Sequence, residues 1–317
     1  MSVLVTGATG FIGRNLLGTA LKCHKKIVIS RHGRNPFRKD PSVVFFQCDL
    51  RKFREVDAIF RRFRIDAVVH FSTAGIRKAS KQEIWETNVQ GTFNLLEAAV
   101  ARRVCRFINV GTCGERIALE MANNINSENS WKLAHFLSKI AQTALVQEFN
   151  QRRGLPTVNL RLYHVYGPQE RESRLFPRIL NAAILGNTVD LSPGRRKRDF
   201  VFVDDVVRAV DSTVTIPRFP RGRILDIATG EGLSIHRVVG VLRRKSYASK
   251  AFAPHFGGLP YDLTDVTALV GDPKPARRFL RWSPRVNISE GLDRMEAAIR
   301  KAQSGDLEDA VSPGSGR

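Results

Sequence analysis

The stretch Thr6-Gly7-Ala8-Thr9-Gly10-Phe11-Ile12-Gly13 follows a short apolar run, residues 3–5, close to the start of the chain. Its glycines allow a very tight turn between a strand and a helix, because they lack the Cβ that would crowd it. Such a turn brings backbone N–H groups close to a pyrophosphate, and a helix over residues 14–21 is expected to follow. The pattern predicts a dinucleotide-binding site at Gly7, Gly10, Phe11, Ile12 and Gly13. An ordinary glycine-rich turn is the alternative.

The composition is that of a globular protein. The chain has 317 residues, of which 43% are apolar, enough for the core of one large α/β unit or of two lobes. No apolar run approaches the roughly 20 residues of a membrane helix, and no basic, cleavable leader precedes the first strand. We therefore expect a cytoplasmic protein with no membrane partner. The cysteines show neither a C-x-x-C pair nor metal-ligand spacing, so no metal site is expected: Cys23, Cys48, Cys105 and Cys113.

The formal net charge of +21 would suit an anionic substrate, an acidic surface or a nucleic acid. The basic doublets at 61–62, 102–103, 152–153 and 243–244 lie far apart, without the interleaved aromatic residues that stack on bases. A generally basic, solvated surface is the favoured interpretation, and no nucleic-acid partner is expected. Residues 303–317 are rich in Gly, Ser, Asp and Pro and are predicted to be disordered.

Apolar runs at 26–30, 43–46 and 67–71 are typical of strands, and helical stretches separate them. This alternation predicts an α/β fold with a doubly wound parallel sheet, the Rossmann arrangement. Beyond residue 168 the strict alternation is lost, which indicates a smaller carboxyl-terminal α/β lobe. The predicted division is a dinucleotide-binding domain over 1–170, with a return segment near 198–230, a substrate-binding lobe over 171–302, and the tail.

Arginines stand where an NAD-specific site usually has an acidic residue. That residue follows the second strand and holds the 2′-hydroxyl of the ribose, whereas this chain has Ser30-Arg31 there, with Arg34 and Arg14 nearby. Guanidinium groups suit a 2′-phosphate, so the sequence favours NADP over NAD as the cofactor. The alternative is that these arginines belong to the general basic surplus.

The wording TGATGFIG, together with residues 87–99, TNVQGTFNLLEAA, resembles the extended short-chain dehydrogenase/reductase family. Most members of that family oxidise and reduce nucleotide-linked sugars. The resemblance implies that Asp49 and Leu50, just after the third strand, contact the adenine, and that Asn88 hydrogen-bonds backbone near the active site. Without the family, the Asn and Gly inside an amphipathic helix already indicate a polar partner and a close neighbour.

The family places its catalytic groups after the fifth strand, here residues 106–110. Thr112 occupies the position of the Ser/Thr hydroxyl that hydrogen-bonds the reacting sugar oxygen. Further along, the family has Tyr-x-x-x-Lys, in which the Lys holds the nicotinamide ribose and lowers the pKa of the Tyr. This chain has His135 and Lys139 in those positions, and none of its four tyrosines has a Lys four residues on.

His135 leaves two interpretations open. Its imidazole can exchange a proton near neutral pH, and activity would then follow one ionisation between about pH 5 and 8. Alternatively, His135 only fills space, and the proton passes through Thr112 or water, or the site is inactive. In either case Lys139 is expected to bind the cofactor.

Further matches extend the resemblance to about residue 300. The segment 161–168, RLYHVYGP, has His164 where the family commonly has an Asn that touches the substrate. The segment 198–206, RDFVFVDDV, resembles a family segment whose Arg, here Arg198, commonly contacts the diphosphate of the sugar nucleotide. Without the family, this basic run on a Pro-Gly loop is more typical of a solvated loop.

The resemblance implies an NAD(P)-dependent nucleotide-sugar enzyme that transfers hydride at a hexose ring carbon, as a C4 epimerase or a 4-ketoreductase. A 4,6-dehydratase is the least favoured, because the family's dehydratases have Asp-Glu after the catalytic Thr and this chain has Cys113-Gly114. The main alternative is a catalytically silent NADP-binding module of the same fold. The helices expected over 86–101 and 132–153 resemble the pair that many members pack into a homodimer, which is the assembly we expect.

Overall fold

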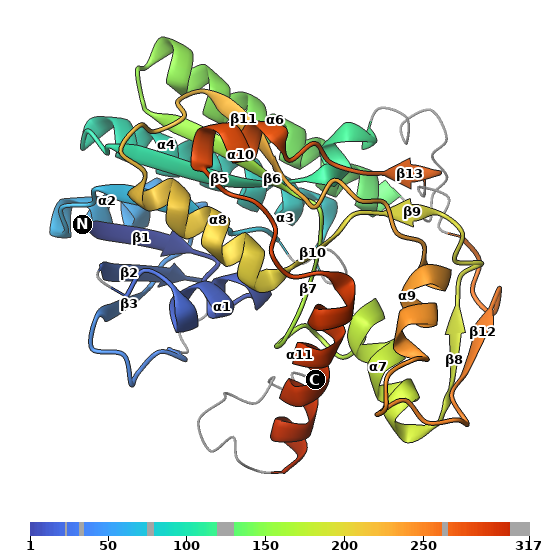
Figure 1. The fold of residues 1–317 in the computed structure, drawn as a ribbon. Helices are drawn as coiled ribbons and strands as arrows, with labels where there is room; N and C mark the ends of the chain where they lie inside the picture. The colour runs from blue at the N-terminus through green and yellow to red at the C-terminus, as the bar shows by residue number, and fades with distance from the viewer. Residues whose placement is uncertain (23, 32–34, 75–78, 119–129, 262–265, 305–317) are drawn as a thin grey trace.

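The computed structural model describes residues 1–22, 24–31, 35–74, 79–118, 130–261 and 266–304. A seven-stranded parallel sheet forms its centre, in the order β11-β6-β5-β4-β1-β2-β3 (Figure 1). The strands are β1 (Ser2–Thr6), β2 (Lys25–Ser30), β3 (Val43–Gln47), β4 (Ala67–His70), β5 (Arg106–Thr112), β6 (Thr157–Leu162) and β11 (Arg223–Ile227). The strand order reverses between β1 and β4, which is where doubly wound sheets bind ligands. The predicted doubly wound α/β fold is confirmed.

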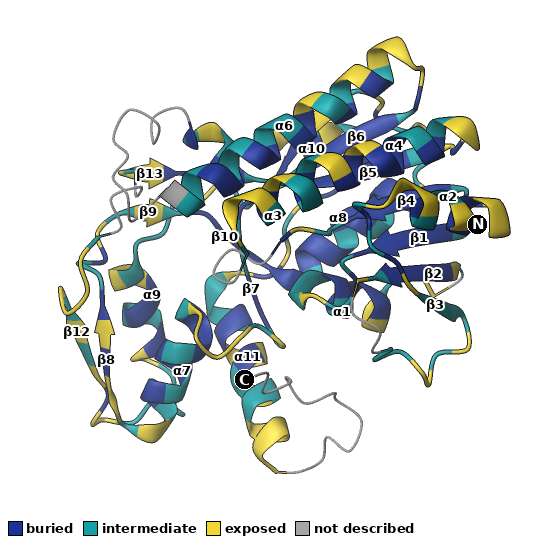
Figure 2. Cartoon of the chain, turned by 180° about the vertical axis from the view of Figure 1, so that it is seen from behind, coloured by how far each residue is buried: buried dark blue, intermediate teal, exposed yellow. Residues whose placement is uncertain are grey.

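Helices cover both faces of the sheet, because successive residues of a buried strand point to opposite sides. In β1, Val3 and Val5 join a core formed with α1 (Phe11–Thr19), α8 (Val203–Thr215) and α10 (Lys274–Leu280). Leu4 points to the other face and joins a core with α2 (Phe53–Arg62), α4 (Gly91–Ala101) and α6 (Ser130–Arg152). Figure 2 shows the helices of this second layer in front, with exposed residues facing outward.

A second group of elements lies beside the sheet, at the lower right of Figure 1. Its helices are α7 (Leu175–Leu185), α9 (Ile235–Leu242) and α11 (Ile288–Gln303), which share a hydrophobic core. Three two-stranded parallel pairs accompany them: β7 (His164–Tyr166) with β10 (Phe200–Phe202), β8 (Thr188–Leu191) with β12 (Ala253–Phe256), and β9 (Lys197–Arg198) with β13 (Ala268–Leu269). The domain boundary expected at residue 170 stays a prediction. Helix α10, which belongs to the expected second lobe, packs against β11 and α8 at the main sheet.

Asp205 in α8 ties the two groups of elements together. Its buried carboxylate accepts hydrogen bonds from the backbone N–H groups of Arg285 and Val286, both at 3.0 Å. Its carbonyl accepts one from the Trp282 indole at 2.8 Å. Trp282 packs in the core of the main sheet and Val286 in the core of α7, α9 and α11, so one aspartate anchors the chain as it passes from one core to the other.

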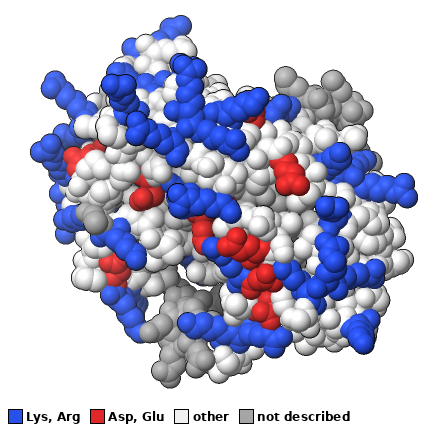
Figure 3. All heavy atoms as spheres, in the orientation of Figure 1, with Lys and Arg blue, Asp and Glu red and all other residues white. Residues whose placement is uncertain are grey.

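The basic side chains are distributed rather than gathered. Figure 3 shows Lys and Arg over most of the visible face, with acidic side chains collected mainly near its centre. Within the described part of the chain, no helix is both long and apolar enough to cross a membrane.

The glycine turn excludes side chains at two positions. Gly7 has a φ of +67°, and a Cβ there would lie 2.8 Å from the backbone of Phe71 and Ser72, at the end of β4. A Cβ on Gly13 would lie 2.5 Å from Cα of Ala8 and 2.6 Å from the Gly7 oxygen. The first turn of α1 therefore packs backbone against backbone on the end of β1.

We predict that Gly13→Ala lowers the free energy of unfolding by roughly 1–3 kcal/mol, because the added methyl meets backbone that cannot move without opening the turn. Urea unfolding followed by circular dichroism measures the change. Gly18→Ala is the matched control: Gly18 is exposed on the same helix, and a Cβ there meets nothing within 4 Å. That substitution should be neutral or stabilise by up to about 1 kcal/mol. Equal losses in the two variants would contradict the close-packed turn.

Candidate active site

The site begins where the glycine turn leads into α1. Gly10 caps this helix without any side-chain hydrogen bond, so its first N–H groups are not covered by a capping side chain. Phe11 and Ile12, both half-buried, form the first turn of the helix. Glycines at positions 7 and 13 let this helix end pack closely on the end of β1, and an anion is favoured at the helix end by the N–H groups and the helix dipole. The turn therefore fits a pyrophosphate.

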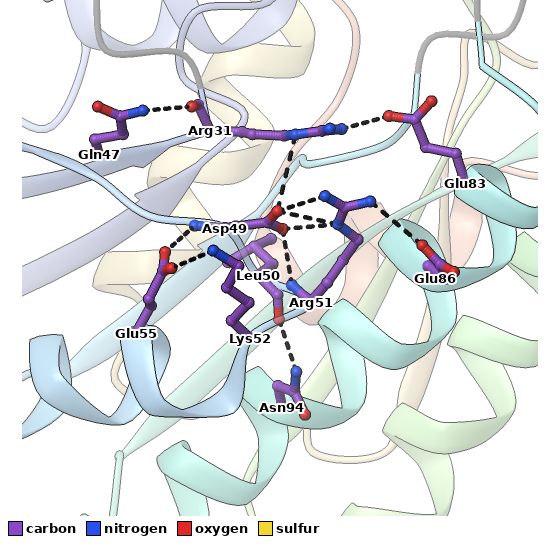
Figure 4. A network of polar contacts seen from close by, with 10 residues as sticks. All are labelled: Arg31, Gln47, Asp49, Leu50, Arg51, Lys52, Glu55, Glu83, Glu86 and Asn94. Carbon is purple, nitrogen blue, oxygen red and sulfur yellow. Dashed lines mark hydrogen bonds and ion pairs between the residues drawn. The ribbon is translucent and has the colours of Figure 1, made fainter.

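A charged cavity of about 530 Å³ lies beside the ends of β2 and β3, lined by Arg31, Gln47, Asp49, Arg51, Lys52 and Glu55. Figure 4 shows its arginines held by carboxylates: Arg31 pairs with Glu83, and its Nε lies 3.8 Å from Oδ2 of Asp49. Arg51 binds both Asp49 oxygens, at 2.6 to 3.0 Å, and these hydrogen bonds lower the pKa of Asp49. The Leu50 carbonyl accepts a hydrogen bond from the Asn94 amide at 2.7 Å, which fixes this loop to α4.

The three arginines predicted near the 2′-position have different surroundings. Arg31 is 46% exposed and lies on the cavity wall, paired with Glu83. Arg14 donates from Nε to the Thr9 carbonyl at 2.8 Å and so braces the glycine turn. Arg34 lies outside the described residues.

Asn88 lies in a π-helical segment that the sequence analysis did not anticipate. Instead of one helix over 86–101, the chain forms α3 (Lys81–Trp85), the π-helical η1 (Glu86–Gln90) and then α4. The wider turn is a common feature of functional sites. The fully buried Asn88 amide accepts a hydrogen bond from the Ala74 N–H at 3.0 Å and donates one to Oγ of Ser138 at 2.9 Å. Ser138 in turn donates to the His135 carbonyl, so Asn88 connects η1 to the helix that carries His135.

Thr112 and the Lys139 ammonium both lie near the carboxyl end of β5. Thr112 ends the strand, and its hydroxyl caps the short helix η2 (Cys113–Arg116) by accepting from the Gly114 N–H at 3.3 Å. Lys139, on α6, donates from Nζ to the Val110 carbonyl at 2.8 Å and to Oε1 of Gln142. Burial lowers the pKa of Lys139 to about 8, against the opposing attraction of Glu115.

His135 lies one helical turn before Lys139 and is only 6% exposed. Burial, with the Lys139 ammonium adding to it, lowers the pKa of His135 to about 4. The imidazole is therefore neutral at neutral pH, and its ionisation lies below the range of about pH 5 to 8 that an unperturbed imidazole suggests. Its Nδ1 is buried and has no hydrogen-bond partner among the described residues, so it is an unsatisfied acceptor in this site.

Glu115 belongs to this site and was not among the predicted residues. Its carboxylate accepts from the Thr112 N–H at 2.8 Å and from the Thr143 hydroxyl at 3.1 Å. Burial raises its pKa, against the hydrogen bond from Thr112 and the attraction of Lys139. Thr112 and Glu115 form a capping box, and the T-x-x-E spacing was the available signal in the sequence.

A second cavity, of about 250 Å³, contains one of the two predicted substrate residues. Its lining is His164, Val165, Glu170, Ser173, Arg174, Leu175, Phe176 and Phe200. Nδ1 of His164 and Oε2 of Glu170 are buried without a hydrogen-bond partner among the described residues. Burial raises the pKa of Glu170 to about 7 and, helped by Arg198, lowers that of His164 to about 3.

Arg198 does not line that cavity. Its guanidinium donates to the carbonyls of Lys197 and Val266, at 2.8 and 2.9 Å. Across the described ranges, no three His, Cys, Asp or Glu side chains come together as metal ligands.

The chain is similar in sequence and in fold to known proteins. Residues 3–228 match the model of the "NAD dependent epimerase/dehydratase family". A UDP-glucuronate 4-epimerase of Thermodesulfobacterium geofontis is 27% identical over 315 residues, covering 92% of this chain and 94% of the relative. A dTDP-glucose 4,6-dehydratase of Haemophilus influenzae is 26% identical over 328 residues, covering 92% and 96%. The structure of a UDP-glucuronic acid 4-epimerase from Bacillus cereus, in complex with UDP-glucuronic acid and NAD, matches with a TM-score of 0.80 at 23% identity, covering 95% of this chain and 100% of that one.

The lowered pKa of His135 predicts a pH-dependent stability. Between its folded value of about 4 and its ordinary value near 6.5, the unfolded chain binds more protons than the folded one. The free energy of unfolding should therefore fall as the pH drops through this range. We predict that His135→Phe reduces that fall by up to about 3 kcal/mol, measured by urea unfolding at pH 7 and 4.5. The wild type is measured alongside, and an unchanged pH dependence in His135→Phe would show that His135 is not held neutral.

Proposed function

Because the chain belongs to the NAD dependent epimerase/dehydratase family, we propose that it oxidises and reduces C4 of a hexose in a nucleotide-linked sugar, as a 4-epimerase or 4-ketoreductase. The observation that carries the proposal is the buried Lys139 ammonium beside Thr112 at the end of β5. Two of its protons bond to Val110 and Gln142, and the third has no acceptor among the described residues. That proton is suited to a ribose hydroxyl.

The residues that would hold the dinucleotide extend from the glycine turn to Lys139. They are Gly7, Gly10, Phe11, Ile12 and Gly13 at the pyrophosphate, Asp49 and Leu50 at the adenine, and Lys139 at the nicotinamide ribose. When bound, the nicotinamide supplies the hydride chemistry. Thr112 would donate to or accept from the reacting sugar oxygen, and His135, as a neutral imidazole, would take the proton of the sugar hydroxyl. The second cavity, with His164 and Arg174, and the neighbouring Arg198 would bind the rest of the sugar nucleotide.

The surroundings of Thr112 favour an epimerase or ketoreductase over a dehydratase. Dehydratases of the family have Asp-Glu after this residue, and here a side chain on Gly114 would begin 2.2 Å from the Phe136 ring. Burial raises the pKa of the Cys113 thiol to about 12, so it supplies neither a proton at neutral pH nor a base. The acidic pair cannot be accommodated at these two positions without moving Phe136.

A catalytically silent dinucleotide-binding module is the second candidate. It is favoured by His135, whose pKa of about 4 makes it a weak base toward an alcohol. Such a module would bind the dinucleotide with Lys139 in place and turn over no sugar nucleotide.

For the cofactor, we propose NADP, with Arg31 as the partner of the 2′-phosphate. Arg31 lies on the wall of the adenosine-side cavity, half-exposed. Its ion pair with Glu83 is a partly exposed one of the kind that contributes little energy, so the guanidinium can turn to a doubly charged phosphate. Arg14 is already committed to the glycine turn and is the weaker candidate.

For the assembly, we propose a homodimer formed through the layer of α3, α4 and α6. Large apolar side chains are exposed on this layer, Trp85 at 41% and Phe93 at 38%. A second copy would bury them.

The first test is turnover. Purified protein should convert at least one of UDP-glucose, UDP-glucuronate and dTDP-glucose, with or without NADPH, as followed by NMR of the sugar ring protons. Lys139→Met should abolish both turnover and tight dinucleotide binding. His135→Phe should lower the rate about 10²- to 10⁴-fold with dinucleotide affinity retained, as expected for loss of a general base. Dinucleotide binding without turnover in every case would select the silent module.

The second test concerns the 2′-phosphate. Arg31→Ala should weaken NADP about ten- to a hundredfold and leave NAD nearly unchanged, because one charge-assisted pair is lost. Glu83→Gln frees the guanidinium and should strengthen NADP severalfold. Calorimetric titration with both dinucleotides measures the effects, and parallel changes for NAD and NADP would refute the assignment.

The third test concerns assembly. Phe93→Asp places a charge at the proposed interface and should convert a dimer into a monomer in sedimentation velocity at micromolar concentration. Phe53→Asp, at an exposed position on α2, is the matched control. A wild-type monomer would remove the proposal.

A further inference from the structure

The Lys139 ammonium is enclosed in protein and needs acceptors there. Lys139 is 4% exposed, and each N–H of a buried ammonium that lacks a partner is costly. The Val110 carbonyl supplies one acceptor and Oε1 of Gln142, one turn further along α6, supplies another. Gln142 is itself fully buried.

The contact with the ammonium fixes the orientation of the Gln142 amide. An ammonium only donates, so the amide oxygen must face Lys139 and the amide nitrogen must face away. That nitrogen donates to Oγ1 of Thr92 on α4 at 2.7 Å. The Thr92 hydroxyl proton then goes to the Asn88 carbonyl, at 2.6 Å, inside η1.

A second branch of hydrogen bonds reaches the same hydroxyl from the glycine turn. Nε2 of His70 lies 2.9 Å from Oγ1 of Thr92, whose own proton is already donated, so this nitrogen carries the proton. Nδ1 of His70 then accepts from the Thr6 hydroxyl at 2.7 Å. Thr6 in turn accepts from the Ser72 N–H at 3.2 Å. Every proton between Thr6 and Lys139 has one consistent position, with a neutral His70.

We propose that Gln142 is a positioning residue for Lys139, holding the ammonium at the carboxyl end of β5 and linking its position, through Thr92 and His70, to the glycine turn. The role in catalysis rests on the proposed function, since Lys139 is the residue that would hold the nicotinamide ribose. Gln142 acts through Lys139 and touches neither substrate nor cofactor.

The charged and titratable groups around Lys139 come from four elements. Glu115 of η2 attracts the ammonium, and Arg161 of β6 lies 4.0 Å from Glu115. His70 of β4 and His135 of α6 are neutral at neutral pH, since burial lowers their pKa to about 3 and about 4. Gln142 is thus the uncharged side chain that stabilises the ammonium most directly.

The inference is tested first without any cofactor. The folded pKa of Lys139 is about 8 and its ordinary value about 10.5, so the free energy of unfolding should rise with pH between them. Gln142→Met removes an acceptor and should move the start of this rise down by about one pH unit. Gln142→Glu adds a carboxylate and should move it up by about one pH unit. Urea unfolding of the full chain from pH 6.5 to 10.5 measures both.

Two controls separate a positioning role from a general loss of packing. In a Lys139→Met background, neither substitution at Gln142 should move the curve, because the titrating group is gone. Gln147→Met, on the same helix but away from the network, should leave the wild-type curve in place. Wild-type curves for both Gln142 variants would overturn the inference. A shift that persists without Lys139 would overturn it as well.

The second measurement is NADPH affinity across the same pH range, followed by fluorescence. Gln142→Met should lose about tenfold in affinity at pH 8.5, and Gln142→Glu should extend tight binding to higher pH. Shifted unfolding curves without NADH or NADPH binding by the wild type would support the contact and refute the proposed function. Normal binding with identical pH dependence in all variants would refute the inference alone.

Discussion

The close contact between β1, the glycine turn and the first turn of α1 is the constraint on which the rest of the site depends. Backbone atoms of Ala8 and Gly7 leave no space for a Cβ at position 13, and backbone at the end of β4 leaves none at Gly7. Because these contacts involve no side chains that could rearrange, they set how far α1 stands from the sheet. The same contacts place the uncapped start of α1 at the end of β1, and they place the Thr6 hydroxyl against His70.

Behind that turn lies an unusually polar interior. Between β4, η1, η2, α4 and α6 the chain buries an ammonium, two imidazoles, two amides and a carboxylate. Burial lowers the pKa of His70, His135 and Lys139 and raises that of Glu115, so each group is moved toward its neutral form. Such perturbed groups gather at functional sites, because a packed core gains nothing from them. Gln142 and Thr92 supply hydrogen-bond partners to the Lys139 ammonium and the Asn88 carbonyl without adding a further charge.

Burial also determines which groups next to Thr112 can exchange a proton. A thiol that stays protonated and a glycine against an aromatic ring occupy positions 113 and 114, and the acidic group that follows them, Glu115, accepts hydrogen bonds from the Thr112 N–H and the Thr143 hydroxyl. In contrast to Cys113, Glu170 in the second cavity has a pKa near neutrality. Burial raises this pKa, and Arg174 opposes the rise. A carboxyl group that titrates near the working pH can both donate and accept, and it faces the same cavity as an unpartnered imidazole nitrogen.

Short-range patterns in the sequence were sufficient for the parallel sheet and the glycine turn, because strand alternation and glycine sterics act within a few residues. The role given to Lys139 came from the family resemblance and stays a prediction. The π-helical segment at Asn88, the capture of Arg31 by Glu83 and the Gln142 network were not readable there, since their partners lie 14 to 64 positions apart in the chain. The acid–base properties of His135 also required the tertiary structure. An imidazole has its ordinary pKa until the fold removes water from it and sets an ammonium nearby, and only the packed helix α6 does both.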